Sequence, residues 1–343
     1  MADEDSDQPS DRLRERAEES RWKLWFLLEA DRRVVALVLL GTIFVVLQVS
    51  GMVYPTTEGA IRSSDSVDTV FQGFLTATIT GVTLVLTLNQ LVLSQELGAA
   101  GDQRERMEKA LSFRDDAAAM VEAPVAPARP SQFLRALVQV AGERARDLRE
   151  AVPDDGDLAS AVDDLVASLT ENADRVSDNL DGAQFGEFEV VSAALNFNYS
   201  WKVFAAQRID AEYGDELDEA GSDALDRLSE VLKLFGPARE HFKTLYFQWE
   251  LINLSRAILT ASIPALLVSV FMVSFFNDAT FGGTTLGMKN IILAFSAGST
   301  LAMMPFIILL AYVLRIATVT KHTLSIGPFI LRDTDQVEEV EWN

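Results

Sequence analysis

Few side chains in this sequence could do covalent or proton-transfer chemistry within its long apolar runs. There is no cysteine, and the only histidines are His241 and His322. The four apolar runs contain no Asp, Glu, Lys, Arg or His. Because proton relays and charge-coupled transporters place ionisable groups at membrane depth, this pattern argues against a proton pump. A retinal protein is excluded as well, since its Schiff base needs an intramembrane lysine.

Other chemistry is equally poorly represented. The absence of cysteine excludes thiol catalysis, disulfides and iron–sulfur clusters. The sequence contains no phosphate-binding loop, dinucleotide fingerprint, nucleophile elbow or histidine cluster. We therefore expect no catalytic residue, no cofactor and no bound metal, and a protein that is not an enzyme.

The most distinctive pattern is a register of small and polar residues in the apolar stretch 66–94. They recur at steps of three and four, which keeps one stripe facing a common partner or axis. The register comprises Ser66, Thr69, Gly73, Thr76, Thr80, Thr83, Thr87, Gln90 and Ser94. Its candidate functional members are Gly73, Thr76, Thr80, Thr83, Thr87, Gln90 and Ser94.

Two interpretations of this stripe remain open. Small residues let membrane helices approach closely, and Gly73, Ala77 and Gly81 form a second ladder that favours such packing. Alternatively, the hydroxyls line a water-filled pore in a symmetric oligomer, because pore walls use neutral polar side chains.

The elements that must position the stripe are four predicted membrane spans. Each has about the 20 apolar residues that cross a bilayer. They are 34–54 and 69–95, which form a first hairpin over 34–95, and 257–276 and 291–314, which form a second over 257–314. A disordered acidic tail (1–10) and an interfacial helix (11–33) come first, and a cytoplasmic acidic tail (315–343) follows.

Residues 96–256 form an insert between spans two and three, with helical patterning and little strand signal. We expect a helix opened by a capping box at Asp102 and Glu105 and running to about Met120. Two more helices have apolar faces: Leu134, Leu137, Val138, Ala141, Ala145 and Leu148; then Leu158, Val162, Leu165, Leu169 and Val176.

The aromatic cluster at 196–202 is expected in the core. A helix at about 215–235 ends at Gly236, and Pro237 begins another that continues into span three. The fold class is all-α, a four-span bundle with an inserted helical cytoplasmic domain.

The distribution of charge sets the orientation and the partners. Lys and Arg are scarce in the loops 55–68 and 277–290 and frequent in the tails and insert, so both termini should be cytoplasmic in the cell membrane. The net charge of −22 with few lysines resembles halophile proteins. It also argues against nucleic acid, which requires basic patches. The expected partners are the lipid bilayer, further copies of the chain and a cytoplasmic protein.

The run LNQLVLSQELGAAGDQRERMEKA (88–110) resembles one found in uncharacterised haloarchaeal multi-pass membrane proteins, a likeness that implies no particular activity. The plan of four spans with a helical insert is similar to bestrophin-type anion channels, whose second span lines the pore. That similarity is one of architecture, so it assigns no residue a role.

These observations give two functional hypotheses. The first is a non-enzymatic, oligomeric ion channel whose second span lines the pore. The alternative is a membrane-anchored signalling, regulatory or scaffold protein that binds partners through the insert.

Overall fold

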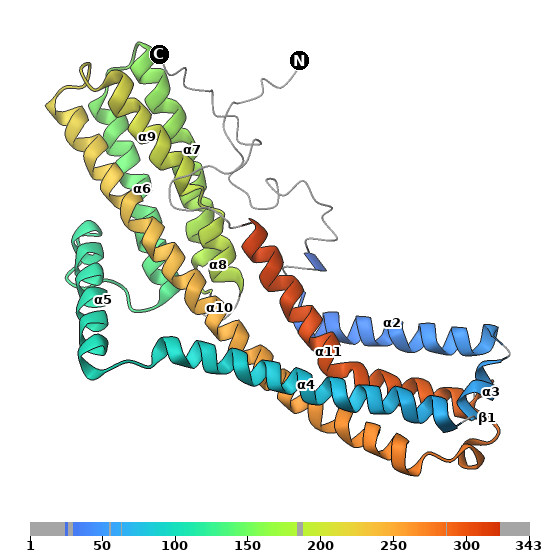
Figure 1. Ribbon diagram of the computed structural model, residues 1–343. Helices are drawn as coiled ribbons and strands as arrows, with labels where there is room; N and C mark the ends of the chain where they lie inside the picture. Colours follow the sequence, from blue (N-terminus) through green and yellow to red (C-terminus); the bar gives the residue numbers. More distant parts are fainter. Residues whose placement is uncertain are drawn as a thin grey trace, which may run out of the picture. The chain divides into compact units, whose positions relative to one another are not determined.

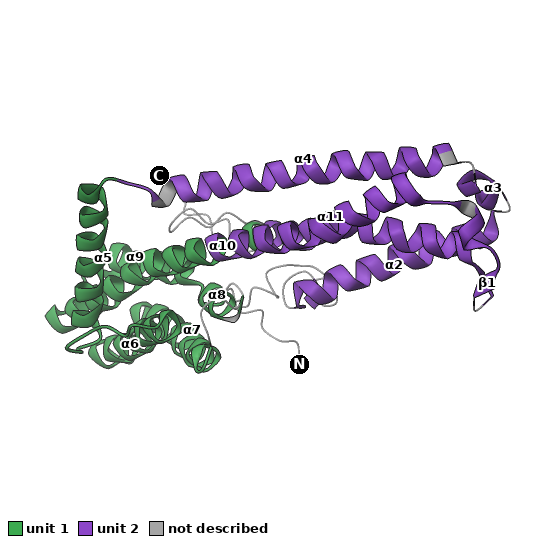
Figure 2. Ribbon diagram, turned by 90° about the horizontal axis from the view of Figure 1, so that it is seen from below, with its two compact units in different colours: residues 1–24, 99–247, 319–343 green, residues 25–98, 248–318 purple. Residues whose placement is uncertain are grey.

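The computed structural model describes residues 25–26, 30–54, 56–62, 64–183, 188–285 and 287–322. These residues are almost entirely helical, and the strands among them are only Thr284–Thr285 (β1) and Met288–Lys289 (β2), which pair antiparallel. The chain divides into two compact units (Figures 1 and 2). Unit 1 comprises residues 1–24, 99–247 and 319–343, and unit 2 comprises residues 25–98 and 248–318.

Unit 2 contains the apolar helices. Four helices of the described chain are long and apolar enough to cross a membrane, as the sequence predicted. They are α2 (Arg32–Val53), α4 (Ser64–Glu96), α10 (Glu219–Phe275) and α11 (Asn290–His322), of which α10 also contributes its first half to unit 1. Short elements join them at one end: α3 (Thr57–Arg62), the 3-10 turn η2 (Asp278–Phe281) and the β1–β2 hairpin.

Within unit 2, α11 lies between α2 and α4 (Figure 2). On the α2 side, a Cβ added at Gly51 would lie only 2.5 Å from Cγ2 of Ile292. On the α4 side, a Cβ at Gly298 would lie 3.2 Å from Cζ of Phe71. Glycine at both positions therefore allows close approach of neighbouring helices, which is the packing expected between membrane helices.

The surface of unit 2 is apolar, unlike that of unit 1. Among the described residues, the exposed large hydrophobic side chains that belong to unit 1 are only Met107, Leu111 and Val125; all the others lie in unit 2. A soluble protein rarely exposes so continuous an apolar surface. This distribution fits helices that are surrounded by lipid.

Unit 1 is a helical bundle with its own core. Its helices are α5 (Ala100–Met120), α6 (Pro130–Ala151), α7 (Asp157–Leu180), α8 (Phe188–Leu195), α9 (Tyr199–Tyr213) and the first part of α10. The apolar faces predicted for α6 and α7 are confirmed, since all eleven of those side chains are buried. Phe197 and Tyr199 of the aromatic cluster are also buried, and the Phe197 ring packs edge-on against Phe235 at 4.7 Å between centroids.

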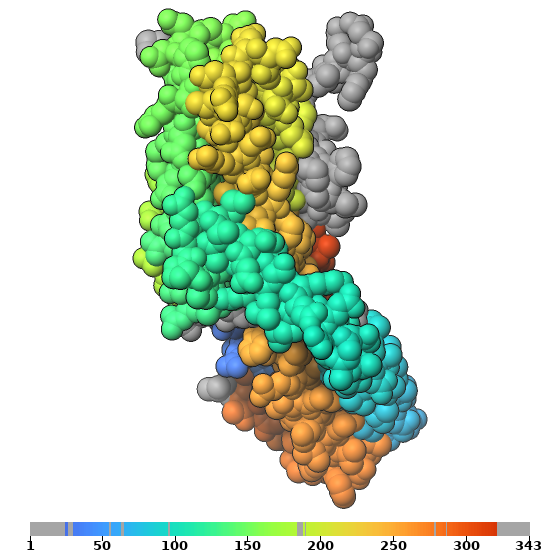
Figure 3. All heavy atoms as spheres, turned by 90° about the vertical axis from the view of Figure 1, so that its left-hand side faces the viewer, coloured from blue at the N-terminus to red at the C-terminus, as the bar shows by residue number. Residues whose placement is uncertain are grey.

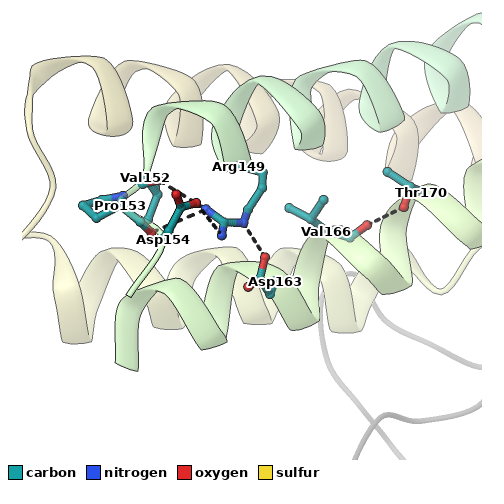
Figure 4. Close-up of polar contacts among 7 residues, drawn as sticks. All are labelled: Arg149, Val152, Pro153, Asp154, Asp163, Val166 and Thr170. Carbon is teal, nitrogen blue, oxygen red and sulfur yellow. Dashed lines mark hydrogen bonds and ion pairs between the residues drawn. The ribbon is translucent and has the colours of Figure 1, made fainter. Parts of the chain in front are cut away.

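The turn between α6 and α7 is held by one arginine (Figure 4). Nη1 of Arg149 donates to the carbonyls of Val152 (3.2 Å) and Pro153 (3.4 Å). Its Nη2 donates to Asp154 at 3.2 Å, and its Nε donates to Asp163 in α7. This arginine thus binds the carbonyls of the two residues that follow α6 and links them to α7.

Two predictions about helix ends are wrong. The capping box at Asp102 is not formed, because α5 already begins at Ala100 and Ala99 is its N-cap without a side-chain hydrogen bond. The chain also does not break at Gly236: α10 runs without interruption from Glu219 to Phe275. A Cβ at Gly236 would lie 2.8 Å from Cε2 of Tyr199, so this glycine makes room for a ring rather than ending a helix.

Some predicted segments lie outside the described residues. These are the acidic tail 1–10, most of the interfacial helix 11–33, and residues 323–343 of the C-terminal tail. Residues 315–322, predicted from the sequence to belong to that tail, are part of α11. Similarly, α4 begins at Ser64, earlier than the predicted span start at residue 69.

Candidate functional site

The candidate stripe lies on α4, on the side of that helix that no other described element covers. All seven of its candidate residues are exposed: Gly73, Thr76, Thr80, Thr83, Thr87, Gln90 and Ser94. Figure 3 shows α4 at the surface of unit 2 along its length. Among the described residues of one copy, the stripe therefore makes no packing contact with another helix.

The face of α4 that packs on the rest of unit 2 is the opposite one. It carries the buried residues Val67, Phe71, Thr78 and Val85, and half-buried Asn89. Successive residues are about 100° apart around a helix, which places this face about 180° from the stripe. The small-residue ladder is split between faces, because Gly73 has nothing within 4 Å of an added Cβ while Gly81 faces Phe306.

Exposed apolar residues flank the stripe on both sides. Ile79, Leu86 and Leu93 lie on one side, and Leu84, Leu88 and Leu91 on the other. The stripe on α4 is therefore bordered on each side by exposed apolar residues. A helix of this kind suits a position where its flanks contact other apolar helices and its stripe contacts something polar.

The hydroxyls of the stripe are satisfied by their own helix. Those of Thr76, Thr80, Thr83 and Thr87 donate to the carbonyl four residues earlier, at 2.9–3.0 Å. Each hydroxyl hydrogen is thus directed at the backbone, and the oxygen retains lone pairs that can accept from another group. Chemically, the threonine positions of the stripe are a row of uncharged hydrogen-bond acceptors.

At its C-terminal end, α4 is joined to α10 by a polar contact. Oγ of Ser255 lies 2.7 Å from Oδ1 of Asn89 and can donate to it. Asn89 therefore acts as polar glue between membrane helices, with its side chain on the packed face rather than in the stripe.

A buried charge cluster holds the end of unit 2 at which α2 begins. Arg32 forms an ion pair with Glu250 of α10, whose side chain is 2% exposed. The Arg32 guanidinium also lies over the Tyr312 ring, 5.3 Å from its centroid. Nearby, Arg315 of α11 donates to the carbonyl of Ala30 at 3.0 Å. These contacts join the start of α2 to both α10 and α11.

An exposed ion-pair cluster lies at the opposite end of the unit 2 helices. Glu58 of α3 accepts from Lys289 of β2 and from Nη2 of Arg62 at 2.8 Å. The hydrogen bond from Lys289, and then that from Arg62, hold the pKa of this carboxyl below its usual value. The two connecting segments, 55–63 and 277–289, are thereby linked.

Sequence reasoning missed Glu250 and Gln48. Glu250 lies outside the predicted spans, so its burial against Arg32 depends on helix positions that a single sequence does not reveal. Gln48 lies in α2 and is only 5% exposed. The signal for Gln48 in the sequence is an uncharged amide inside an apolar run, which carries no charge to distinguish it. Among the described residues, no group of three or more His, Cys, Asp or Glu could hold a metal ion.

Four apolar helices, an apolar unit 2 surface and a separate helical unit together define a multi-pass membrane protein. The chain belongs to the family of unknown function DUF7972, whose model matches residues 1–343. No curated protein and no solved structure matches it. The family agrees with the expected resemblance to uncharacterised proteins, and it brings no activity with it.

Proposed function

We propose that this protein is a non-enzymatic membrane protein that assembles from several copies into an ion channel, with α4 lining the shared path. The observation that carries the proposal is the exposure of the polar stripe on the face of α4 that points away from the rest of its own unit, namely the hydroxyls of Thr76, Thr80, Thr83 and Thr87 and the amide of Gln90. If the stripe contacted only lipid, its row of polar oxygens would lie against hydrocarbon.

Assembly around an axis accounts for all three faces of α4. The buried face packs on the same copy, the apolar flanks contact α4 helices of neighbouring copies, and the stripe faces the axis. Cyclic assembly repeats one contact around a closed ring, so a single stripe per copy becomes the whole lining. A neutral hydroxyl lining is one that aqueous pores use.

The setting of the proposed channel follows from charge. It lies in the cell membrane with both termini and residues 96–256 in the cytoplasm, because Lys and Arg are concentrated in those segments. Its net charge of −22 is an adaptation of the water-exposed surface to high salt. Its partners are the lipid bilayer and further copies of the chain.

Single-cysteine labelling tests the lining directly, because the chain contains no cysteine of its own. Cysteines replace stripe residues (Thr76, Thr80, Thr83, Thr87) in protein reconstituted into liposomes, and a membrane-impermeant thiol reagent is applied. Labelling of these positions is expected. Leu84 and Leu88, exposed but apolar, and Val85, buried on the packed face, are the matched controls and should be protected.

Ion flux gives the second test. Liposomes containing the purified protein should pass ions down an imposed gradient, and reagent bound at Thr83→Cys should reduce the flux while the same treatment of Val85→Cys leaves it unchanged. Equal protection of stripe and control positions, together with no flux, would rule the channel out.

A second function, partner binding through unit 1, is favoured by the surface of α5. Only the last part of this helix packs on the unit 1 core, through Phe113, Ala117, Ala118 and Met120. Earlier, Met107 and Leu111 are exposed one turn apart, forming an apolar pair that a partner helix could cover. The full chain should then capture a cytoplasmic protein, and a Met107→Asp/Leu111→Asp variant should lose it; no difference between the two would argue against this role.

A further inference from the structure

Gln48 is an unsatisfied amide inside the unit 2 bundle. Its side chain is 5% exposed, and neither Oε1 nor Nε2 has a hydrogen-bond partner among the described residues. A buried amide without a partner is costly, and more so in hydrocarbon, where no bulk water reaches it. Native structures rarely leave both ends of a carboxamide unpaired.

Hydroxyls with the same property occur on α11. Ser296 and Ser299 are 1% and 3% exposed, and their Oγ atoms have no partner within the described chain; nor has Oγ1 of Thr300. Of the other hydroxyls in the apolar helices, that of buried Thr78 in α4 also has no partner within the described chain. Nine others donate to a carbonyl four residues earlier: Thr42, Thr76, Thr80, Thr83, Thr87, Thr260, Ser262, Ser269 and Thr318. The hydroxyls on this part of α11 are therefore free to bind something else.

Helix register brings Gln48 and these hydroxyls together. The helices α2 and α11 are antiparallel in chain direction, with Gly51 against Ile292 at one end, and Val35 and Ala36 in one cluster with Ile307 and Ala311 at the other. Gln48 lies one turn before Gly51 on the same buried face of α2. Ser296 and Ser299 lie one and two turns after Ile292, on the α11 stripe that continues to Ile307. Counted from the Gly51–Ile292 contact at about 1.5 Å per residue, the backbone of Gln48 is therefore nearly level with Ser296, and Ser299 lies one turn further along the same contact, about 6 Å from the level of Gln48.

The unpaired atoms define the chemistry of what binds there. Nε2 of Gln48 can only donate and Oε1 can only accept, while each serine hydroxyl does both. A cation would bind the oxygens and leave Nε2 unpaired, and an anion would bind the donors and leave Oε1 unpaired. A small molecule that donates and accepts satisfies both ends of the amide, and water is the smallest molecule that does both.

We propose that Gln48, Ser296 and Ser299 form a hydrated site inside the membrane bundle, where water bridges α2 and α11. A buried water typically makes about three hydrogen bonds to polar groups that otherwise lack partners, which this set provides. Gln48 lies five residues before the end of α2 at Val53, about 8 Å along the helix axis. The site is separate from the stripe on α4 and does not depend on channel activity.

Solid-state NMR of the full chain in lipid bilayers tests the proposal. With ¹⁵N in the glutamine side chains, the Gln48 amide is assigned as the resonance that disappears in Gln48→Leu, or in Gln48→Asn should the first variant fail to fold. Transfer of magnetisation from water protons to this resonance is then measured in the wild-type protein. The expected result is clear transfer to Gln48, as to exposed Gln90.

Matched serine variants give the control. Because a buried water makes about three hydrogen bonds, removing two hydroxyls in Ser296→Ala/Ser299→Ala should reduce the transfer about twofold or more. Ser262→Ala/Ser269→Ala removes two buried hydroxyls that already bond to their own helix. This variant should leave the transfer from water to Gln48 unchanged. Two results would overturn the proposal: no transfer from water to Gln48 in the wild-type protein, or a Gln48 resonance that shifts when sodium is replaced by potassium or chloride by bromide, which would assign the site to an ion.

Discussion

Individual buried polar residues tie the helices of unit 2 together. Glu250 is the most costly of these, because its carboxylate is nearly inaccessible and is paired with Arg32, whose side chain is 20% exposed. A buried ion pair gains little over an apolar pair, yet removing one partner leaves the other charge uncompensated. The pair therefore matters more for which helices meet than for total stability.

This asymmetry predicts the effect of changing Glu250. Glu250→Gln keeps the size of the side chain and should lower the free energy of unfolding of the purified protein by about 3 kcal/mol, since the buried ion pair with Arg32 is lost. Denaturant unfolding in detergent measures it. Glu230→Gln, on an exposed position of the same helix, is the control and should change stability by less than about 0.5 kcal/mol. Equal effects of the two variants would show that the ion pair is not stabilising.

Two glycines provide a second test at the scale of single residues. Gly236 lies against an aromatic ring, whereas Gly101 has open space beside it. Gly236→Ala should destabilise the protein by about 1–3 kcal/mol, since the new Cβ overlaps the Tyr199 ring. Gly101→Ala, in α5 with nothing within 4 Å of an added Cβ, should instead stabilise the helix by up to about 1 kcal/mol. Thermal unfolding of both variants distinguishes the two outcomes; stabilisation by both would mean that Tyr199 moves aside without cost.

At the scale of elements, hydrophobic periodicity predicted helices and their faces well. The faces of α6 and α7 follow directly from leucine and valine spacing, because burial of one stripe is what makes such helices stable. The join at Gly236–Pro237 could not be predicted, since a glycine–proline pair ordinarily ends a helix. Contact with Tyr199, far away in sequence, explains this glycine instead, and a single sequence does not reveal that contact.

The helix α4 could be located from the sequence, but the direction of its stripe could not. The 3.5-residue register identified which residues share a face, and it left open whether that face packs on another helix. Only the burial of Phe71, Thr78 and Val85 places the stripe on the other side. The residues of the stripe could therefore be predicted from the sequence, but whether they are packed or exposed could not.

The hydroxyl geometry of α4 predicts the ion that a channel would pass. Because the threonine hydrogens are directed at backbone carbonyls, the threonine positions of the stripe present oxygen lone pairs, which favour cations over anions. Planar-bilayer recordings in a salt gradient should give a reversal potential on the cation side. Thr83→Val, which removes an oxygen without changing shape, should reduce conductance, whereas Thr78→Val on the packed face should not. A reversal potential on the anion side would contradict this reading of the stripe.

At the scale of the molecule, the surface of unit 1 is suited to water and the surface of unit 2 is suited to lipid. Unit 2 exposes apolar side chains along four helices, whereas unit 1 encloses a core built from residues 117–238 and exposes charge. Burial of apolar surface is the main stabilising contribution in water, and unit 1 obtains it from its own helices. Unit 2 has no comparable polar surface, and lipid supplies the apolar surroundings that its exposed side chains need.

This difference predicts that residues 99–247 fold without the rest of the chain. The fragment contains every residue of the unit 1 core, so it should be soluble and helical by circular dichroism, and should unfold cooperatively in urea. Leu165→Ala, which removes a fully buried side chain, should lower its unfolding free energy by about 2–5 kcal/mol. Asp164→Ala, at the adjacent exposed position, should have little effect. A fragment that is helical but melts without cooperativity, or in which both variants behave alike, would mean that the unit 1 core needs the membrane helices to form.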